Sequence, residues 1–313
     1  MARTLAITLG DPQGIGLEVS IAATARLLAE APDTTVLAFG ADGLSVPGAT
    51  YMPVGAWDGS RRGAGQISIE AIRRAVALAL GGHVDAVITA PVHKPALHAA
   101  GWNVPGQTEL LERLAGGGPV GMLMDAEQTR CGGALRVLLA TTHLPLRDVP
   151  ARLTPELLIE QTELLYGSLR EGWQIESPRI ALCALNPHAS DEGLFGDEEA
   201  RVYGPALDAL GARGITATGP VPADTVFRRA LDESFDAVVA PYHDVGMAAF
   251  KTAAFGGGVN VTLGLPFVRT SPDHGTAFDL VGRGKADPAS MLEALKLARR
   301  LAEARFDTAA RGV

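Results

Sequence analysis

The chain has 313 residues, 47% of them hydrophobic, which is enough to bury the core of one large or two medium-sized α/β domains. Its formal net charge of −8 argues against a nucleic-acid-binding protein, because such proteins usually carry a basic face. Two cysteines, Cys131 and Cys183, are too few for a disulfide framework. With neither a signal peptide nor an apolar run of membrane-spanning length, a soluble cytoplasmic protein is expected.

Short apolar runs alternate with segments of helical spacing along the chain. Strands are predicted at residues 4–9, 36–39, 86–90, 137–142, 180–185, 236–240 and 259–263, the last continuing into residues 264–271. Helices are predicted at residues 18–29, 67–80, 108–114, 155–169, 198–212, 225–234 and 288–306, whereas residues 41–66 are expected to be irregular. This alternation is typical of mostly parallel sheets with helices on both faces, so the fold class is α/β.

A glycine-rich turn, residues 10–16, follows the first strand. It lacks the Gly-x-Gly-x-x-Gly order of a dinucleotide fingerprint and the lysine–hydroxyl pair of a nucleotide-binding loop. Two interpretations stay open. A tight strand-to-helix turn needs glycine in any case, and the N-terminus of the following helix can hold an anion.

Three histidines, His143, His188 and His243, each follow a predicted strand. Ligands of open α/β sheets bind at the carboxyl ends of strands, so these side chains are candidates to converge on one site. Three neutral imidazoles with open coordination positions suit a divalent catalytic metal. Taken singly, each is more often a structural histidine, and no short ligand spacing links them. His274 is a fourth candidate.

A second group of polar residues surrounds the glycines at 256–258: Lys251, Asn260 and Arg269. A lysine and an arginine beside an amide can clamp a phosphate or a carboxylate. The alternative is that they are ordinary solvated side chains.

Over nearly its whole length, the chain resembles the 4-hydroxythreonine-4-phosphate dehydrogenase (PdxA) family. The matching segments are Gly10-Asp11-Pro12 with Gly14-Ile15-Gly16, Pro91-Val92-His93-Lys94, Thr141-Thr142-His143-Leu144-Pro145-Leu146, Asn186-Pro187-His188-Ala189, Pro222-Ala223-Asp224-Thr225, Tyr242-His243-Asp244, and residues 258–271 with Asp273-His274-Gly275-Thr276. So many matches in the same order are far more specific than any single motif.

The resemblance implies two α/β/α domains with mostly parallel sheets, as in isocitrate and isopropylmalate dehydrogenases, with the active site in the cleft between them. Residues 1–125 and 262–313 are expected to form a discontinuous first domain and residues 126–261 the second. A homodimer is implied as well, in which both subunits supply ligands to each metal site.

The resemblance also implies roles for individual residues. His143, His188 and His243 match the ligands of one divalent metal, which would be zinc, magnesium or cobalt. Substrate-contacting positions are matched by Gln107, Thr108, Lys251, Asn260 and Arg269, and catalytic positions by Asp224 and Lys251. The family binds NAD or NADP without the usual glycine fingerprint.

The implied reaction is NAD(P)-dependent oxidation of 4-phosphohydroxy-L-threonine at its 3-hydroxyl, followed by decarboxylation to 3-amino-2-oxopropyl phosphate, in pyridoxal phosphate biosynthesis. The chain departs from the family at Gln107, where a histidine is usual. Glutamine can hydrogen-bond substrate oxygens but cannot carry charge or transfer a proton. Alternatives are therefore the same chemistry on 4-phospho-threonate, 4-phospho-erythronate or a terephthalate cis-dihydrodiol, and, in another class, a phosphate-binding protein without catalysis.

Overall fold

The computed structural model describes residues 2–310 and divides into two compact units. Unit 1 comprises Met1–Gly118 with Leu265–Val313, and unit 2 is Pro119–Gly264. The boundaries predicted from the sequence, at 125/126 and 261/262, would fall inside β5 (Gly121–Ala126) and β10 (Val259–Leu263). In the structure both strands lie whole in unit 2.

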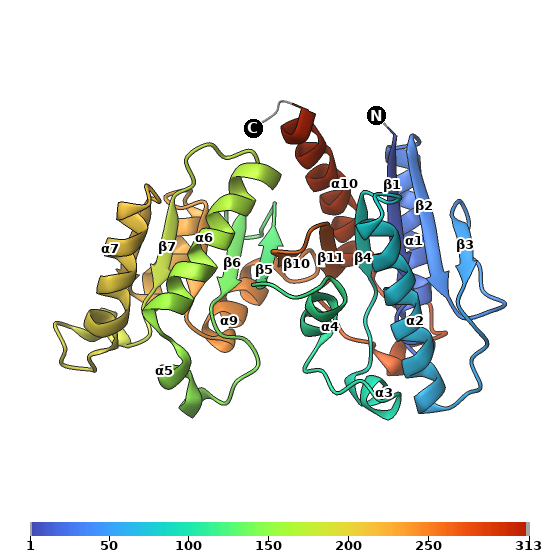
Figure 1. Ribbon diagram of the computed structural model, residues 1–313, viewed down its shortest axis with the longest axis horizontal. Coiled ribbons are helices and arrows are strands. Elements are labelled where there is room, and N and C mark those ends of the chain that lie inside the picture. The colour runs from blue at the N-terminus through green and yellow to red at the C-terminus, as the bar shows by residue number, and fades with distance from the viewer. Residues whose placement is uncertain (1, 311–313) are drawn as a thin grey trace. The chain divides into compact units, whose positions relative to one another are not determined.

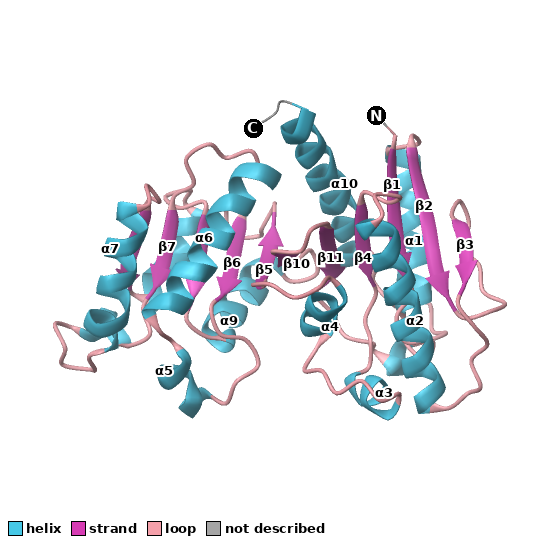
Figure 2. Cartoon of the chain, in the orientation of Figure 1, coloured by secondary structure: helices cyan, strands magenta, loops and turns pink. Residues whose placement is uncertain are grey.

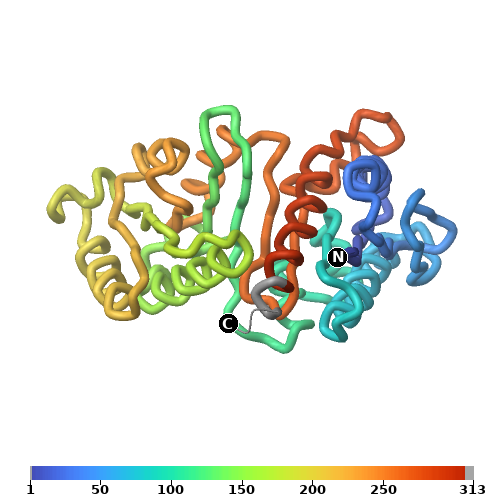
Figure 3. The backbone as a smooth tube through the Cα atoms, turned by 90° about the horizontal axis from the view of Figure 1, so that it is seen from above, coloured from blue at the N-terminus to red at the C-terminus, as the bar shows by residue number. Residues whose placement is uncertain are grey.

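Unit 1 is a parallel sheet between helices (Figures 1 and 2). Its strand order is β3 (Thr50–Pro53), β2 (Thr34–Gly40), β1 (Arg3–Thr8), β4 (Ala86–Thr89), β11 (Val268–Pro272). Its helices are α1 (Gly16–Glu30), α2 (Arg61–Leu80), α3 (Lys94–Ala99), α4 (Gln107–Leu114), the short η4 (Phe278–Leu280) and α10 (Ala289–Ala310). The first and last helices of the described residues lie side by side here: α10 lies beside α1 on one face of the sheet, while α2 covers the other (Figure 3).

Unit 2 is a mixed sheet with the strand order β10, β5, β6 (Leu135–Leu139), β9 (Ala237–Ala240), β7 (Ile180–Cys183), β8 (Ala217–Val221). The pairs of β5 with β10 and with β6 are antiparallel, and the other pairs are parallel. Its helices are η1 (Leu146–Asp148), α5 (Val149–Arg152), α6 (Pro155–Gly172), η2 (Pro187–Ser190), the π-helix η3 (Glu199–Tyr203), α7 (Gly204–Ala212), α8 (Ala223–Leu231) and α9 (His243–Ala254). Helices α6 and α7 cover one face of the sheet, and α8 and α9 the other (Figure 1).

The predicted α/β class is confirmed, but the segment predicted to be irregular contains structure. Strand β3 lies inside it, and α2 begins at Arg61 rather than at residue 67. Ser60 caps this helix, since its hydroxyl accepts a hydrogen bond from the Gly63 amide at 2.9 Å. Gly65 lets this helix pack closely, because a Cβ there would lie 2.0 Å from the carbonyl oxygen of Ala96.

Several short elements were not predicted, namely α3, β5 and β8, and residues 268–272 form the separate strand β11 rather than an extension of β10. In addition, α9 starts directly at His243, in a segment where no helix was predicted. Within residues 2–310, no helix combines the length and the apolar character needed to span a membrane.

The turn after β1 shows why glycine occupies position 10. Gly10 has φ +71°, and a Cβ there would lie 2.2 Å from the carbonyl oxygen of Pro91. The neighbouring Asp11 amide donates to that same oxygen at 3.0 Å. This geometry favours the tight-turn interpretation of residues 10–16.

We expect Gly10→Ala to lower the free energy of unfolding by at least about 2 kcal/mol, because it adds both a left-handed backbone penalty and a clash with backbone. Thermal or urea unfolding monitored by circular dichroism measures the change. The matched control is Gly43→Ala, which has φ +79° but nothing within 4 Å of the added Cβ. If the two variants lose equal stability, close approach to Pro91 is not what selects glycine at position 10.

Candidate functional site

The topology of unit 2 brings together the strands that precede the three histidines. Strands β6 and β7 each pair in parallel with β9, so the three carboxyl ends are neighbours. His143 follows β6, and His243 follows β9 as the first residue of α9. Their imidazole rings lie 5.5 Å apart between centroids.

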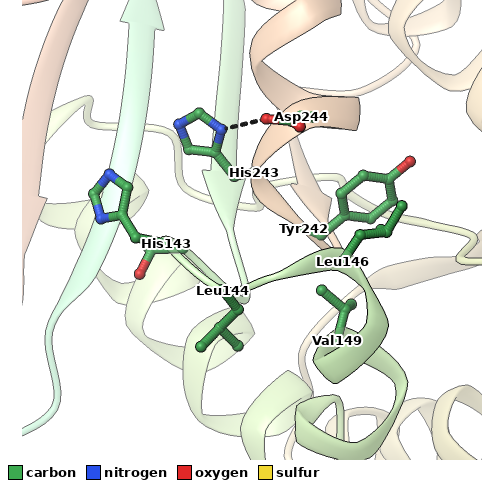
Figure 4. A pocket seen from close by; sticks show the side chains of 8 residues that line it. His143, Leu144, Leu146, Val149, Tyr242, His243 and Asp244 are labelled. Carbon is green, nitrogen blue, oxygen red and sulfur yellow. Dashed lines mark hydrogen bonds and ion pairs between the residues drawn. The ribbon is translucent and has the colours of Figure 1, made fainter.

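A pocket of about 100 Å³ opens beside these two rings. Figure 4 shows His143 and His243 on one side of it and Tyr242, Leu146 and Val149 on the other. The Asp244 carboxylate lies 2.7 Å from Nδ1 of His243. A carboxylate in this position favours the tautomer with the proton on Nδ1, which leaves Nε2 of His243 free to accept a metal.

His188 stands on a loop of unusual backbone conformation after β7. Residues 188–192 all have φ between 44° and 70°, and Gly193 follows at 95°. For residues other than glycine the left-handed helical conformation costs about 1–2 kcal/mol each. Within residues 2–310, no three His, Cys, Asp or Glu side chains stand close enough to enclose a metal ion. His188 therefore does not complete a set of three with the other two within one chain.

The carboxylate of Glu199, 6% exposed, fastens this loop. Its Oε1 accepts from the backbone amides of Leu185 at 3.0 Å and Asn186 at 2.7 Å, and its Oε2 accepts from Asn186 Nδ2 at 2.8 Å and from the hydroxyl of Ser190. Burial raises the pKa of Glu199, but the hydrogen bonds from Ser190 and Asn186 outweigh burial, and the net pKa is lowered. Nothing in the sequence spacing singled this residue out.

In unit 1, Arg269 is the largest fully buried side chain, at 2% exposure. Its Nη2 donates to the hydroxyl of Thr89 at 2.6 Å and to Oε1 of Gln107 at 3.4 Å, and Gln107 Nε2 donates to the Ala90 carbonyl at 3.3 Å. Burial lowers the pKa of Arg269 to about 9, so the guanidinium stays charged at neutral pH. The sequence interpretation of Arg269 as a solvated charge is wrong, because β11 places it in the interior.

The other candidate residues fall at the ends of elements. Thr108 lies in the first turn of α4, half-buried, and Lys251 in the last turn of α9, also half-buried. Asn260 lies on β10, and its amide oxygen is buried without a hydrogen-bond partner among the described residues. Asp224 is exposed in the first turn of α8.

Another pocket, about 490 Å³ in volume, lies in unit 1. The sequence did not predict it. It is lined by Gln13, Arg61, His93 and Phe278, and the rings of His93 and Phe278 meet edge to face at 5.1 Å. Beside it, burial raises the pKa of Asp11, although the Gln13 amide and the His93 charge partly offset this. The missed signal is that β1 and β4 pair in parallel and are followed within a few residues by Asp11 and His93.

Gln107 lets us test whether Arg269 must be available to bind an anion. We expect Gln107→Glu, which keeps the side-chain shape, to lower kcat/KM at least about tenfold, since a carboxylate beside Arg269 repels an anionic substrate. Steady-state kinetics with the phosphorylated substrate proposed below measure the effect. The control Gln66→Glu adds the same charge to an exposed position of α2. Equal effects of both variants would rule out a local role for Gln107.

Imidazoles at adjoining strand ends and a buried guanidinium are features of an α/β enzyme rather than of a structural protein. The family model described as pyridoxal phosphate biosynthetic protein PdxA matches residues 23–298. A curated relative from Chromobacterium violaceum, named 4-hydroxythreonine-4-phosphate dehydrogenase, is 43% identical over 95% of this chain and 96% of its own length. The chain therefore belongs to the PdxA family.

Solved structures agree with this placement. A 4-hydroxythreonine-4-phosphate dehydrogenase from Klebsiella pneumoniae superposes with a TM-score of 0.81 at 37% identity, over 96% of this chain and 99% of that one. A terephthalate 1,2-cis-dihydrodiol dehydrogenase from Burkholderia xenovorans gives 0.65 at 28% identity, over 96% and 98%. An isocitrate dehydrogenase from Methylococcus capsulatus, at 0.54 and 14% identity over 97% of this chain and 88% of that one, shares the fold.

Proposed function

We propose that the protein oxidises 4-phosphohydroxy-L-threonine at its 3-hydroxyl with NAD or NADP and that the product is decarboxylated to 3-amino-2-oxopropyl phosphate. The observation that carries this proposal is the buried Arg269 in a chain of this family, because a buried guanidinium is well suited to binding a phosphate or carboxylate. Relatives that are named dehydrogenases support the redox step.

A divalent metal, zinc, magnesium or cobalt, would be held by His143, His188 and His243. The paired rings and the Asp244 carboxylate on His243 fit such an ion, since neutral imidazoles oriented by a carboxylate are typical ligands. Two histidines of one chain leave the ligand set incomplete, which supports a homodimer in which a second copy of the chain contributes to each site. When bound, the metal would acidify the substrate hydroxyl and stabilise negative charge left by decarboxylation.

The remaining residues bind and orient the substrate. Arg269, held by Thr89 and Gln107, would bind an anionic group of the substrate, and Gln107 and Thr108 would hydrogen-bond its oxygens. The unpartnered amide oxygen of Asn260 would accept a hydrogen bond from a substrate hydroxyl or ammonium group. Lys251 and Asp224 would act at the reacting centre, where an ammonium and a carboxylate can pass and receive a proton.

The nicotinamide dinucleotide would use the pocket of unit 1. Its volume of about 490 Å³ is in the range of small-molecule sites. Phe278 offers an aromatic edge or face for a base, and Arg61 a cation for a phosphate.

The experiment is a substrate comparison with the purified full chain, a divalent metal and each nicotinamide cofactor, followed by absorbance of the reduced cofactor at 340 nm. We expect the highest kcat/KM with 4-phosphohydroxy-L-threonine. A higher value with 4-phospho-threonate or 4-phospho-erythronate would reassign the substrate, and turnover of only the terephthalate cis-dihydrodiol would make the phosphate unnecessary.

The alternative in another class is a phosphate-binding protein without catalysis. It would be favoured if inorganic phosphate stabilised the protein against heat while none of these substrates reduced the cofactor.

Placement in the cytoplasm stays a prediction, which fractionation of the source cells would test.

A further inference from the structure

The loop that carries His188 adopts a conformation that its own sequence disfavours. Five consecutive residues other than glycine, 188–192, have positive φ. Asparagine and glycine adopt this region readily, but alanine, serine and glutamate do not. Contacts from outside the loop must therefore select this conformation.

Several of those contacts come from one carboxylate. Glu199 begins the π-helix η3 and reaches both ends of the loop: it accepts hydrogen bonds from the Leu185 and Asn186 amides before His188 and from the Ser190 hydroxyl after it. The π-helix is itself anchored, because the buried Tyr203 donates to the Cys183 carbonyl of β7 at 2.8 Å. Helices of this kind occur mostly as single-turn irregularities of α-helices, and frequently at functional sites.

We propose that Glu199 is a positioning residue for metal binding: its carboxylate binds residues on both sides of His188 and so holds the left-handed stretch 188–192 in the conformation that presents the His188 imidazole. This inference rests on the proposed metal site. Glu199 itself touches no predicted ligand, so it acts through the backbone of the loop. Without it, the loop would relax toward right-handed or extended conformations, and the imidazole would have to be ordered again on each binding event.

Glu198 provides a matched control. It is the adjacent carboxylate, and its Oε2 accepts from the same Asn186 Nδ2 at 2.8 Å, but the structure gives it no hydrogen bond to the loop backbone or to Ser190 among the described residues. Glu199→Gln keeps the shape of the side chain but replaces one of its two accepting oxygens with an NH₂ group. That group would face hydrogen-bond donors of the loop and could not accept from them. Glu198→Gln makes the same chemical change without that consequence.

The test measures Co²⁺ binding to the metal-free full chain by its visible absorption, in the absence of substrate and cofactor. We expect Glu199→Gln to raise the Kd for Co²⁺ at least about tenfold, as is typical for residues that orient metal ligands, and Glu198→Gln to change it less than about twofold. Amide hydrogen exchange over residues 185–195 should accelerate in the first variant and not in the second.

A rescue separates positioning from general stability. Asp191 is exposed with φ 44°, so Asp191→Gly removes a left-handed penalty without touching the Glu199 hydrogen bonds. Added to Glu199→Gln, it should recover a large part of the lost Co²⁺ affinity. If Glu199 only stabilised the fold, the melting temperature would fall, the affinity of the folded protein would not, and Asp191→Gly would rescue nothing.

The outcomes distinguish this inference from the proposed function. Wild-type Co²⁺ affinity in Glu199→Gln, together with its loss in His188→Ala, would overturn the role of Glu199 and leave the metal site standing. Unchanged affinity in His188→Ala would overturn both. Should Glu199→Gln fail to fold, Ser190→Ala removes one of the same hydrogen bonds, and an unchanged Kd in that variant would overturn the inference.

Discussion

Arg269→Met should lower kcat/KM for the phosphorylated substrate at least about a hundredfold while leaving the protein at least as stable as the wild type. Loss of a hydrogen-bonded buried cation that holds an anion costs about 2–5 kcal/mol of binding. Stability should not suffer, because an apolar side chain of similar length avoids desolvation of the charge. Kinetics and thermal unfolding at pH 7 measure the two effects.

The direction of the stability change follows from the pKa. Burial lowers the pKa of Arg269 to about 9 from 12.5. Between these two values the unfolded chain binds a proton that the folded protein does not, so the contribution of Arg269 to stability becomes more favourable as pH rises through that window. Below pH 9 the folded protein bears the full free-energy cost of burying the cation. In that pH range Arg269→Met should leave the free energy of unfolding unchanged or raise it.

Arg3→Met is the matched control, since Arg3 is also buried in unit 1, at 5% exposure, and its guanidinium lies 3.6 Å from the carboxylate of Asp85. It should lower stability and leave kcat/KM unchanged. Inorganic phosphate should raise the melting temperature of the wild type and of Arg3→Met, but not of Arg269→Met. An Arg269→Met variant that is still protected by phosphate would place the anion elsewhere.

Removal of the metal should abolish turnover. We expect dialysis against a strong chelator to eliminate cofactor reduction and a divalent ion to restore it. His143→Ala should lower kcat at least about a thousandfold, because the metal supplies several kcal/mol of charge stabilisation. Bound metal per chain, measured by mass spectrometry, should fall together with activity.

His83→Ala serves as the control, because His83 is exposed after α2 in unit 1. It should retain both metal and activity. Full activity of the wild type after complete removal of metal would exclude the proposed role of the three histidines, and retention of metal by His143→Ala would exclude this residue as a ligand.

Where local chemistry decides a structure, the sequence was informative. Helix α6 begins as predicted with Pro155, and the Thr154 hydroxyl accepts from the Leu157 amide at 3.2 Å. The pairing of His143 with His243 follows from strand ends that a parallel sheet brings together. Strand β8 was missed because it contains Gly219 and Pro220, which are rare in strands and tolerated here at the edge of the sheet.

What could not be predicted depends on contacts between distant residues. Arg269 is buried because it lies on β11, which pairs with β4. Its hydrophilic side chain gives no local sign in the sequence that this position is buried. Glu199 belongs to a run of acidic residues that looks like a solvated surface, yet it is buried by a loop whose left-handed course no propensity favours. The start of α2 was hidden by Gly63 and Gly65, which have low helix propensity; at Gly65, close packing against α3 outweighs it.

The discontinuous composition of unit 1 has a consequence for biosynthesis. Strand β11 and helix α10 complete its sheet and cover one face, and both are encoded after the whole of unit 2. During synthesis, all of unit 2 leaves the ribosome before unit 1 is complete. Strands β1 and β2 can complete their unit only after β11 and α10 have been translated. Nascent β1 and β2 would meanwhile expose apolar surface, so this region is where we expect chaperones to engage the growing chain.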